Sequence, residues 1–268
     1  MVAGKDFDGW IVVVTGASTG LGRAIAVETA QRGAAAVIVN YVHSEDEARE
    51  TCRLVEANGA QAVLAQGDVA EDADCRRIAA AAEPFRRIDA LFNNAGTTVF
   101  ALNHANLDAV SGEDFIRLYR VNVIGAYQMV RAARPLLEAA DQPGAVVNTS
   151  SIAAVTGIGS SVPYAASKGA LTTMTLSLAR ALAPKIRVNA ICPGFIDTPW
   201  FEKTMTEDSL ARLRKGAAAS APLKVASTAE DVAGAAIFLA SPAARHITGE
   251  TLLVDAGLHL GYAATTAR

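Results

Sequence analysis

The sequence has few cysteines, no long hydrophobic run and no excess of positive charge. Its three cysteines (Cys52, Cys75 and Cys192) are widely spaced and odd in number, so neither a disulfide framework nor a metal-ligand motif is indicated. No segment approaches the roughly 18 uninterrupted apolar residues that span a membrane. The formal net charge of −3 provides no basic field for nucleic acid or anionic lipid.

The N-terminus carries acidic residues early and only a five-residue apolar run, residues 10–14. A signal peptide needs a longer apolar stretch behind a basic start. We therefore expect a reduced, soluble, cytoplasmic protein with no metal and with no membrane or nucleic-acid partner. At 268 residues the chain is long enough for one large α/β domain, which buries about three quarters of its unfolded surface.

Short β-branched runs alternate with longer alanine-rich segments of helical periodicity. The pattern predicts strands at 11–14, 37–41, 62–66, 90–93, 146–149, 187–191 and 251–254, and helices at 20–32, 45–58, after strand three to about 85, 113–139, 161–182 and 228–240. Alternation of this kind requires crossover connections, hence a parallel sheet. We predict one Rossmann-like, doubly wound α/β domain over 1–268, of about seven strands with helices on both faces, carrying a polar insertion at about 194–223.

A glycine-rich stretch, TGASTGLG at 15–22, follows the first predicted strand and opens the first helix. Glycines let the backbone approach a phosphate, and free N–H groups at a helix start complement negative charge. A plain tight turn is the alternative, but a strand before and a helix after are what a dinucleotide site demands.

The spacing of Gly16, Gly20 and Gly22 differs from G-x-G-x-x-G and resembles that of the short-chain dehydrogenase/reductase family in its compact single-domain form. The resemblance extends from about residue 10 to 257. It includes NNAG at 93–96, Tyr164-x-x-x-Lys168, and Pro193-Gly194 followed by Thr198. Members that reduce 3-oxoacyl thioesters are the most similar in pattern.

The resemblance implies four catalytic residues: Asn122, Ser151, Tyr164 and Lys168. Ser151 lies thirteen residues before Tyr164, which is the family's spacing, and Ser150 is the adjacent competitor. A hydride transfer to a carbonyl also needs a proton, which a tyrosine can donate. The resemblance further implies NAD(P)H as the source of the hydride.

Lys168, Ser151 and Asn122 would each assist Tyr164, and Ser151 and Asn122 each also have a structural interpretation. Lys168, one helical turn after Tyr164, would lower the pKa of the phenol and, by the resemblance, hold the nicotinamide ribose. Ser151 would hydrogen-bond the substrate oxygen, or it caps the next segment. Asn122 would hold a water molecule that links Lys168 to solvent, or it is a satisfied buried amide.

The resemblance also implies the contacts with the dinucleotide. They are Gly16, Ser18, Thr19, Gly20, Leu21, Gly22, Asp68, Val69, Asn94, Ala95, Gly96, Tyr164, Lys168, Pro193, Gly194, Ile196 and Thr198, joined by Asn40, Tyr41 and Ser44 after the second strand. Asp68 alternatively caps the next helix. No carboxylate precedes Glu45 after that strand, so we favour NADP(H) over NAD(H), with Arg23 as a substitute for the basic residue absent at Thr19.

The sequence indicates the substrate less clearly than the cofactor. Ligands of this fold bind beyond the carboxyl ends of the strands, which points to the loops at 97–108 and 195–223. The second loop offers an apolar lid (Phe195, Trp200, Phe201 and Met205), although these side chains alternatively anchor the loop. We read Arg212, Arg214 and Lys215 as a solvated helix face.

The sequence therefore predicts an NADP-linked oxidoreductase that reduces a ketone or a 3-oxoacyl compound. The alternatives are a sugar, polyol or other secondary-alcohol dehydrogenase and, from another class, a dinucleotide-binding redox sensor without turnover. The resemblance implies a homodimer or homotetramer in which helices 113–139 and 161–182 pair between subunits.

Overall fold

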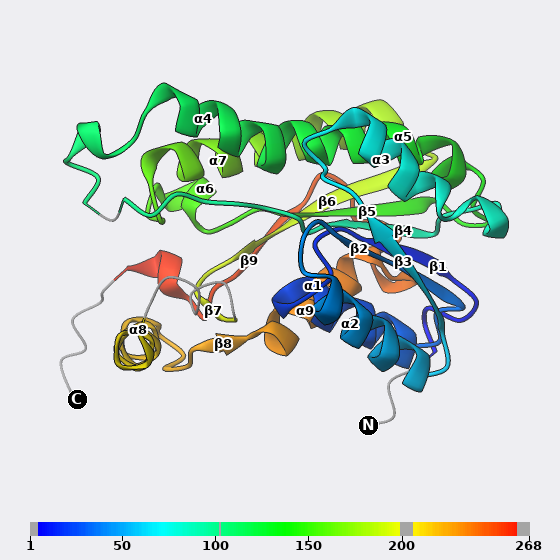
Figure 1. Ribbon diagram of the computed structural model, residues 1–268, viewed down its shortest axis with the longest axis horizontal. Coiled ribbons are helices and arrows are strands. Elements are labelled where there is room, and N and C mark those ends of the chain that lie inside the picture. The colour runs from blue at the N-terminus through cyan, green and yellow to red at the C-terminus, as the bar shows by residue number, and fades with distance from the viewer. Residues whose placement is uncertain (1–4, 102, 199–205, 262–268) are drawn as a thin grey trace.

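Seven parallel strands form one sheet in the order β3-β2-β1-β4-β5-β6-β9 (Figure 1). The computed structural model describes residues 5–101, 103–198 and 206–261. The strands are β1 (Ile11–Val14), β2 (Ala36–Tyr41), β3 (Gln61–Gln66), β4 (Ala90–Asn93), β5 (Gly144–Thr149), β6 (Ile186–Pro193) and β9 (Thr251–Val254). The order reverses between β1 and β4, and in a sheet of this kind that is where a ligand binds.

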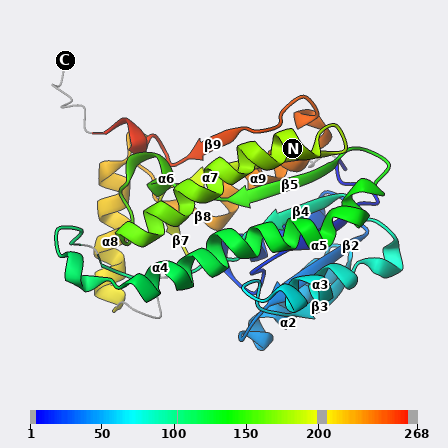
Figure 2. The same cartoon turned by 90° about the horizontal axis from the view of Figure 1, so that it is seen from above.

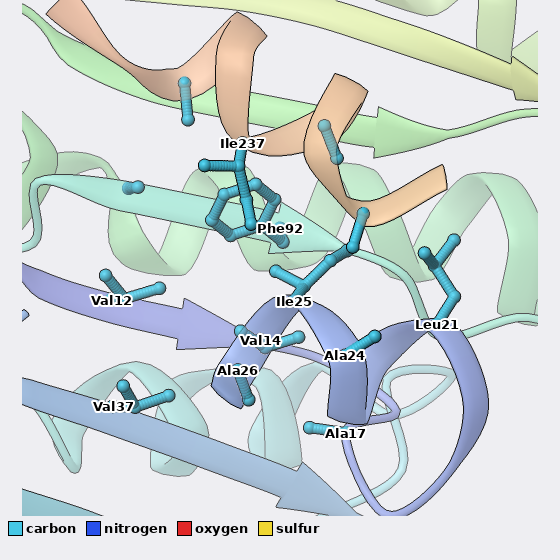
Figure 3. Close-up of a cluster of buried hydrophobic side chains, with 14 of the residues drawn as sticks. Val12, Val14, Ala17, Leu21, Ala24, Ile25, Ala26, Val37, Phe92 and Ile237 are labelled. Atoms are coloured by element: carbon cyan, nitrogen blue, oxygen red, sulfur yellow. The ribbon is translucent and has the colours of Figure 1, made fainter. Parts of the chain in front are cut away.

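Both faces of the sheet are buried, which explains why β1 is an unbroken apolar run. Val12 and Val14 belong to the core on one face, where they meet Ile25 and Ile237 (Figure 3). Ile11 and Val13 belong to the core on the opposite face. Alternate side chains of a strand point to opposite faces, so a strand covered on both sides must be apolar throughout.

Two layers of helices cover the sheet (Figure 2). The layer on the Val12 side contains α1 (Gly20–Gln31), α2 (Glu45–Ala57) and α9 (Ala229–Ala240), and the other contains α3 (Asp72–Ala80), α4 (Gly112–Tyr119), α5 (Ala126–Glu138) and α7 (Val162–Leu182). The doubly wound α/β fold predicted from the sequence is confirmed. No helix of the described residues has both the length and the apolar character needed to cross a membrane.

Helix starts agree with the prediction because the caps are local. Ser111 and Asp114 form a capping box at the start of α4, and Thr228 and Asp231 form one at the start of α9. The Ser161 hydroxyl accepts the N–H of Tyr164 at the start of α7, which places Tyr164 in the first turn of that helix.

Several elements differ from the prediction. The helix expected at 113–139 is interrupted by a π-helical segment, η3 (Arg120–Gly125), between α4 and α5. The insertion at 194–223 holds a short strand, β7 (Ile196–Asp197), and a helix, α8 (Glu207–Ser220), and β7 pairs with β8 (Ser227–Thr228). The helix expected to continue to about residue 85 ends at Ala80, and a 3₁₀ turn, η1 (Glu83–Phe85), follows it. A short helix, α6 (Ala153–Thr156), and three further 3₁₀ turns (η2 Leu107–Ala109, η4 Pro242–Ala244, η5 Leu258–Leu260) were not predicted, because each is too short to show a period.

Candidate active site

A cleft of about 810 Å³ opens at the carboxyl ends of β1, β4, β5 and β6. Its lining contains most of the site residues predicted from the sequence, drawn from segments far apart in the chain. These are Gly16, Ser18, Thr19, Gly20, Leu21, Ser44, Asn94, Ala95, Gly96, Ser151, Tyr164, Lys168, Pro193, Gly194, Ile196 and Thr198. The fold thus brings the glycine-rich turn and the Tyr164–Lys168 pair into one cavity.

The glycine-rich turn is shaped by close approaches that exclude a side chain. Gly16 has φ +60°, and a Cβ there would lie 2.9 Å from the Ala95 Cα. A Cβ on Gly22 would lie 2.3 Å from the Gly16 carbonyl oxygen and 2.6 Å from the Asn94 Nδ2. Gly22 is not among the residues that line the cleft. Its role is to let α1 pack against the end of β4.

The start of α1 fits a phosphate group. Thr19 is its N-cap but makes no side-chain cap, and the first turn contains no acidic residue. The N–H groups of a first helical turn have no partner within the helix, and they carry the positive end of the helix dipole. The turn is therefore suited to the pyrophosphate of a dinucleotide, and the cleft residues fit such a cofactor.

Tyr164, Lys168 and Ser151 meet at the floor of the cleft. The Lys168 ammonium lies over the face of the Tyr164 ring, 5.7 Å from its centroid, and donates to the Thr149 carbonyl at 2.7 Å. The Ser151 hydroxyl hydrogen-bonds the Tyr164 phenol and accepts the N–H of Ala153 at 3.1 Å. The bond to Ala153 confirms the capping interpretation, while the contact of Ser151 with a substrate oxygen stays a prediction.

Ser150, the competitor of Ser151, is directed into the structure. Its hydroxyl donates to the Lys168 carbonyl at 3.0 Å and lies 2.9 Å from the Thr172 hydroxyl. Although Ser150 contributes to the lining, both contacts hold it to α7. It supports the helix that carries Lys168.

Burial dominates the protonation of the site. It raises the pKa of the Tyr164 phenol above its usual value near 10, and the hydrogen bond from Ser151 opposes that rise. It also lowers the pKa of Lys168 to about 8. Without the positive charge of an oxidised nicotinamide, the phenol remains a proton donor at neutral pH.

Asn122 lies in the π-helical segment η3 and is buried. Its Oδ1 accepts the N–H of Thr97 at 2.8 Å, and its Nδ2 donates to the Thr97 carbonyl and to the Ser167 hydroxyl, both at 3.0 Å. Ser167 in turn donates to the Tyr164 carbonyl at 2.8 Å. The amide of Asn122 therefore connects the segment after β4 to the helix of Tyr164, and it does not itself line the cleft.

Asn40 and Tyr41 do not line the cleft either. Asn40 is 1 % exposed, its Oδ1 accepts the N–H of Gly16 at 3.1 Å, and its Nδ2 donates to the carbonyls of Ala65 and Gly67. Tyr41 is 5 % exposed, and burial together with nearby Glu45 raises the pKa of its phenol. Asn40 therefore stabilises the glycine-rich turn through its hydrogen bond with Gly16.

Asp68 and Val69, predicted as adenine contacts, also fall outside the lining. The Asp68 Oδ1 accepts the N–H of Ala70 at 2.9 Å, which is a local turn rather than the cap of α3, since Glu71 holds that position. Val69 is buried, and Gly125 packs against it so closely that a Cβ would lie 2.8 Å from its Cγ2.

Some lining residues were not among the predicted site residues. Arg23 and Glu47 line the cleft beside Ser44, and Thr97, Thr98, Phe100, Thr149 and Ser150 complete the lining. The Arg23 guanidinium donates to the carbonyls of Ser18 (2.6 Å) and Glu47 (2.8 Å). The sequence placed Arg23 beside the turn but carried no signal for Glu47, which approaches only through the packing of α2 on α1.

The second predicted substrate loop is described in part. Trp200, Phe201 and Met205 lie outside the described residues, and Phe195 does not line the cleft. Arg212 and Lys215 are exposed, as expected for a solvated helix face. Arg214 differs, because its Nε donates to both carboxylate oxygens of Asp197, at 2.8 and 2.7 Å, and so ties α8 to β7.

No group of three or more His, Cys, Asp or Glu side chains arranged to hold a metal ion occurs among residues 5–101, 103–198 and 206–261. His43 and His246 are exposed, and His259 pairs with Asp255 at 2.9 Å.

Comparisons with known proteins agree with this geometry. A family model described as enoyl-(acyl carrier protein) reductase matches residues 16–259. A protein of Streptomyces violaceoruber named as a ketoacyl reductase of the granaticin polyketide synthase is 39% identical over 93% of this chain and 96% of its own. An L-rhamnose 1-dehydrogenase (NAD(P)(+)) of Sphingomonas sp. (strain SKA58) is 38% identical over 96% of this chain and 98% of its own.

Solved structures are similar over almost the whole chain. A crystal structure described as a short-chain dehydrogenase/reductase from Burkholderia xenovorans has a TM-score of 0.86 and 42% identity, covering 94% of this chain and 98% of that one. The chain belongs to the short-chain dehydrogenase/reductase family. It is an NAD(P)-dependent oxidoreductase that transfers a hydride between a nicotinamide cofactor and a carbonyl or alcohol substrate.

Proposed function

We propose that the protein reduces a ketone or a 3-oxoacyl compound with NADPH. The observation that carries this proposal is that Ser151, Tyr164 and Lys168 line the same cleft as the glycine-rich turn. The sheet and both helical layers would act as one dinucleotide-binding and catalytic domain. Burial raises the pKa of Tyr164, so its phenol is protonated at neutral pH and can donate the proton that reduction requires.

The residues would divide the work as follows. The nicotinamide, when bound, supplies or accepts the hydride. Ser151 hydrogen-bonds the substrate oxygen and stabilises the charge that develops there. Tyr164 donates its proton to that oxygen. Lys168 holds the nicotinamide ribose, and Asn122 keeps Thr97 and the first turn of α7 at a fixed separation.

Preference for NADP(H) would rest on Arg23 and Ser44 in place of Asn40 and Tyr41. Ser44 is the N-cap of α2 without a side-chain cap, and the Arg23 guanidinium is within the lining. A guanidinium matches the geometry of a phosphate. Glu47 in the same lining opposes a 2′-phosphate, so we expect NADP(H) to be preferred and NAD(H) to be accepted.

Arg23→Met tests this preference. The ratio of the Kd for NADH to the Kd for NADPH, measured by nicotinamide fluorescence, is expected to fall about tenfold, the size of one charged hydrogen bond. Arg53→Met is the matched control, because Arg53 is an exposed arginine on α2 that pairs with Glu50 and does not line the cleft. A ratio unchanged by Arg23→Met would contradict the assignment.

The substrate end of the cleft is described by Thr97, Thr98 and Phe100, beside Ser151 and Tyr164. Apart from Lys168, no charged side chain of the described lining lies in this part. An uncharged carbonyl with apolar carbon beside it suits such a wall. Oxidation of a sugar is the second candidate, favoured by the 38% identity to a rhamnose dehydrogenase.

The experiment compares S-acetoacetyl-N-acetylcysteamine with NADPH and L-rhamnose with NADP⁺, followed by absorbance at the nicotinamide band. Turnover of the thioester at a higher kcat/KM than the sugar supports the proposal. The reverse order supports the sugar dehydrogenase. If the protein binds NADPH tightly but turns over neither of these substrates nor simple ketones, the redox sensor is the remaining hypothesis.

We also propose that the protein assembles through the outer face of α4, α5 and α7. Phe115, Ile116, Tyr127 and Leu176 are large apolar side chains exposed on these elements, and Ile124 is exposed on η3 between α4 and α5. Light scattering is expected to give the mass of a tetramer, and Ile124→Glu should reduce that mass to the mass of a dimer or monomer.

A cytoplasmic location is also proposed, since Cys52, Cys75 and Cys192 are free.

A further inference from the structure

One wall of the cleft is formed by the chain that follows β4. We call its described residues 97–101, 103 and 104 the wall segment. Thr97, Thr98 and Phe100 line the cleft from this segment, facing the part that Tyr164 lines. The position of the segment therefore sets the space beside the phenol.

Three hydrogen bonds fasten the wall segment to the chain just before α7. The N–H of Ala101 donates to the Ser160 carbonyl at 2.7 Å, and the hydroxyls of Thr98 and Ser160 are hydrogen-bonded to each other. The His104 Nε2 lies 3.1 Å from the Gly159 carbonyl. A carbonyl can only accept, so the hydrogen of His104 is on Nε2.

The anchor of these bonds lies against the catalytic ring. A Cβ on Gly159 would lie 3.3 Å from the Cδ1 of Tyr164 and 2.9 Å from the Cβ of Ala153, so the backbone of Gly159 is wedged between them. His104 therefore binds the residue that supports the phenol from behind.

The other end of the wall segment is fastened to the same helix. Both backbone groups of Thr97 bind the amide of Asn122, which reaches the Tyr164 carbonyl through Ser167. The wall segment is thus held at its two ends by bonds that converge on the surroundings of one tyrosine. Nothing in these contacts involves the glycine-rich turn.

We propose that His104 and Ser160 form a latch that fixes the distance between the Phe100 wall and the Tyr164 phenol. They are positioning residues for the carbonyl substrate, and Phe100 selects for apolar carbon beside the carbonyl. The identity of the substrate rests on the proposed function, whereas the hydrogen bonds of the latch do not depend on it. A loop held only for stability would affect cofactor and substrate alike, whereas this latch acts on substrate alone.

The test compares His104→Leu with His104→Gln, which retains a side-chain N–H donor. With ethyl acetoacetate as the probe, His104→Leu is expected to raise the KM about three- to tenfold, the worth of one hydrogen bond. The Kd for NADPH should stay within about twofold. His104→Gln should restore most of the KM. His246→Leu is the matched control, since His246 is exposed and distant in sequence from the latch.

Hydrogen exchange gives a readout that needs no substrate. The Ala101 amide, bonded to Ser160, should exchange slowly in the wild type and faster in His104→Leu and Ser160→Ala. Unchanged exchange at Ala101 in His104→Leu overturns the latch, whatever the KM. Faster exchange with an unchanged KM overturns its positioning role. If the wild type binds NADPH but does not reduce ethyl acetoacetate or the thioester, the proposed function fails, while the Ala101 exchange still decides the latch.

Discussion

The Lys168 ammonium lies over the face of the Tyr164 ring and is bound to the Thr149 carbonyl at the end of β5. A cation over an aromatic face is attracted by the ring, whereas a cation beside the hydroxyl would favour the phenolate. Burial raises the pKa of the phenol, so Tyr164 is protonated at neutral pH before cofactor binds.

Tyr164→Phe is expected to reduce the rate of ketone reduction by about 100- to 10,000-fold, because the proton donor is lost. Ser151→Ala should cost about 100- to 1000-fold, as for the loss of one hydrogen bond to a developing oxyanion. Both variants should bind NADPH like the wild type, measured by nicotinamide fluorescence. A Tyr164→Phe enzyme with full turnover would exclude the phenol as the donor.

Lys168 should make the free energy of unfolding depend on pH in the alkaline range. Its folded pKa of about 8 is below the unfolded value of 10.5, so the unfolded chain binds more protons between these values. Stability therefore rises with pH between about 8 and 10.5, by about 3 kcal/mol at most. Urea unfolding of the wild type and of Lys168→Met at several pH values measures the difference. Parallel pH profiles for the two proteins would contradict the prediction.

Arg187→Met is expected to destabilise the fold by about 3 kcal/mol or more, because it leaves buried carbonyl groups without donors. The Arg187 side chain is buried, and its guanidinium donates to the carbonyls of Leu239, Ala240, Ser241 and Ile247 at and beyond the end of α9. No carboxylate contacts it among the described residues, so the negative end of the helix dipole stabilises the charge.

Arg180→Met is the control for Arg187→Met, since Arg180 is an exposed arginine on α7. Its effect on unfolding should stay within about 0.5 kcal/mol. Equal urea midpoints for the two variants would show that the guanidinium of Arg187 contributes nothing to the packing of α9.

Gly22→Ala should destabilise the protein by about 1–3 kcal/mol and weaken binding of NADPH, because its Cβ has no space. Gly234→Ala, in the interior of α9 with nothing within 4 Å of the added Cβ, should instead stabilise by about 0.5–1 kcal/mol. Thermal unfolding of the pair distinguishes the close approach from helix propensity. Stabilisation by both substitutions would refute the close approach.

Much of the fold was predictable because its signals are local. The strand at 11–14 is recognised by an apolar run that both faces require, and the cleft edge by a glycine-rich turn between strand and helix. Tyr164 and Lys168 could be paired because one helical turn separates them.

The rest depended on contacts between distant segments. In the sequence, Asn40 is a polar residue at a strand end that could donate to a phosphate. In the structure its side chain accepts the N–H of Gly16, and no local pattern reveals that contact. Thr98 and His104 acquire their roles from a loop 55 to 62 residues away. Glu47 reaches the cleft only because α2 packs on α1.

The π-helical segment η3 carries Asn122, whose amide joins the segment after β4 to α7. Deleting one residue from 120–125 would restore the regular helical bonding that the segment lacks. A π-helical turn holds about one residue more than an α-helical turn, so the deletion would leave Met129, Ala133 and Leu137 facing the core that they fill. It would instead displace Asn122, whose amide joins Thr97 to Ser167. The irregular turn is therefore required by the residue that it carries and not by the packing of the helix that follows it.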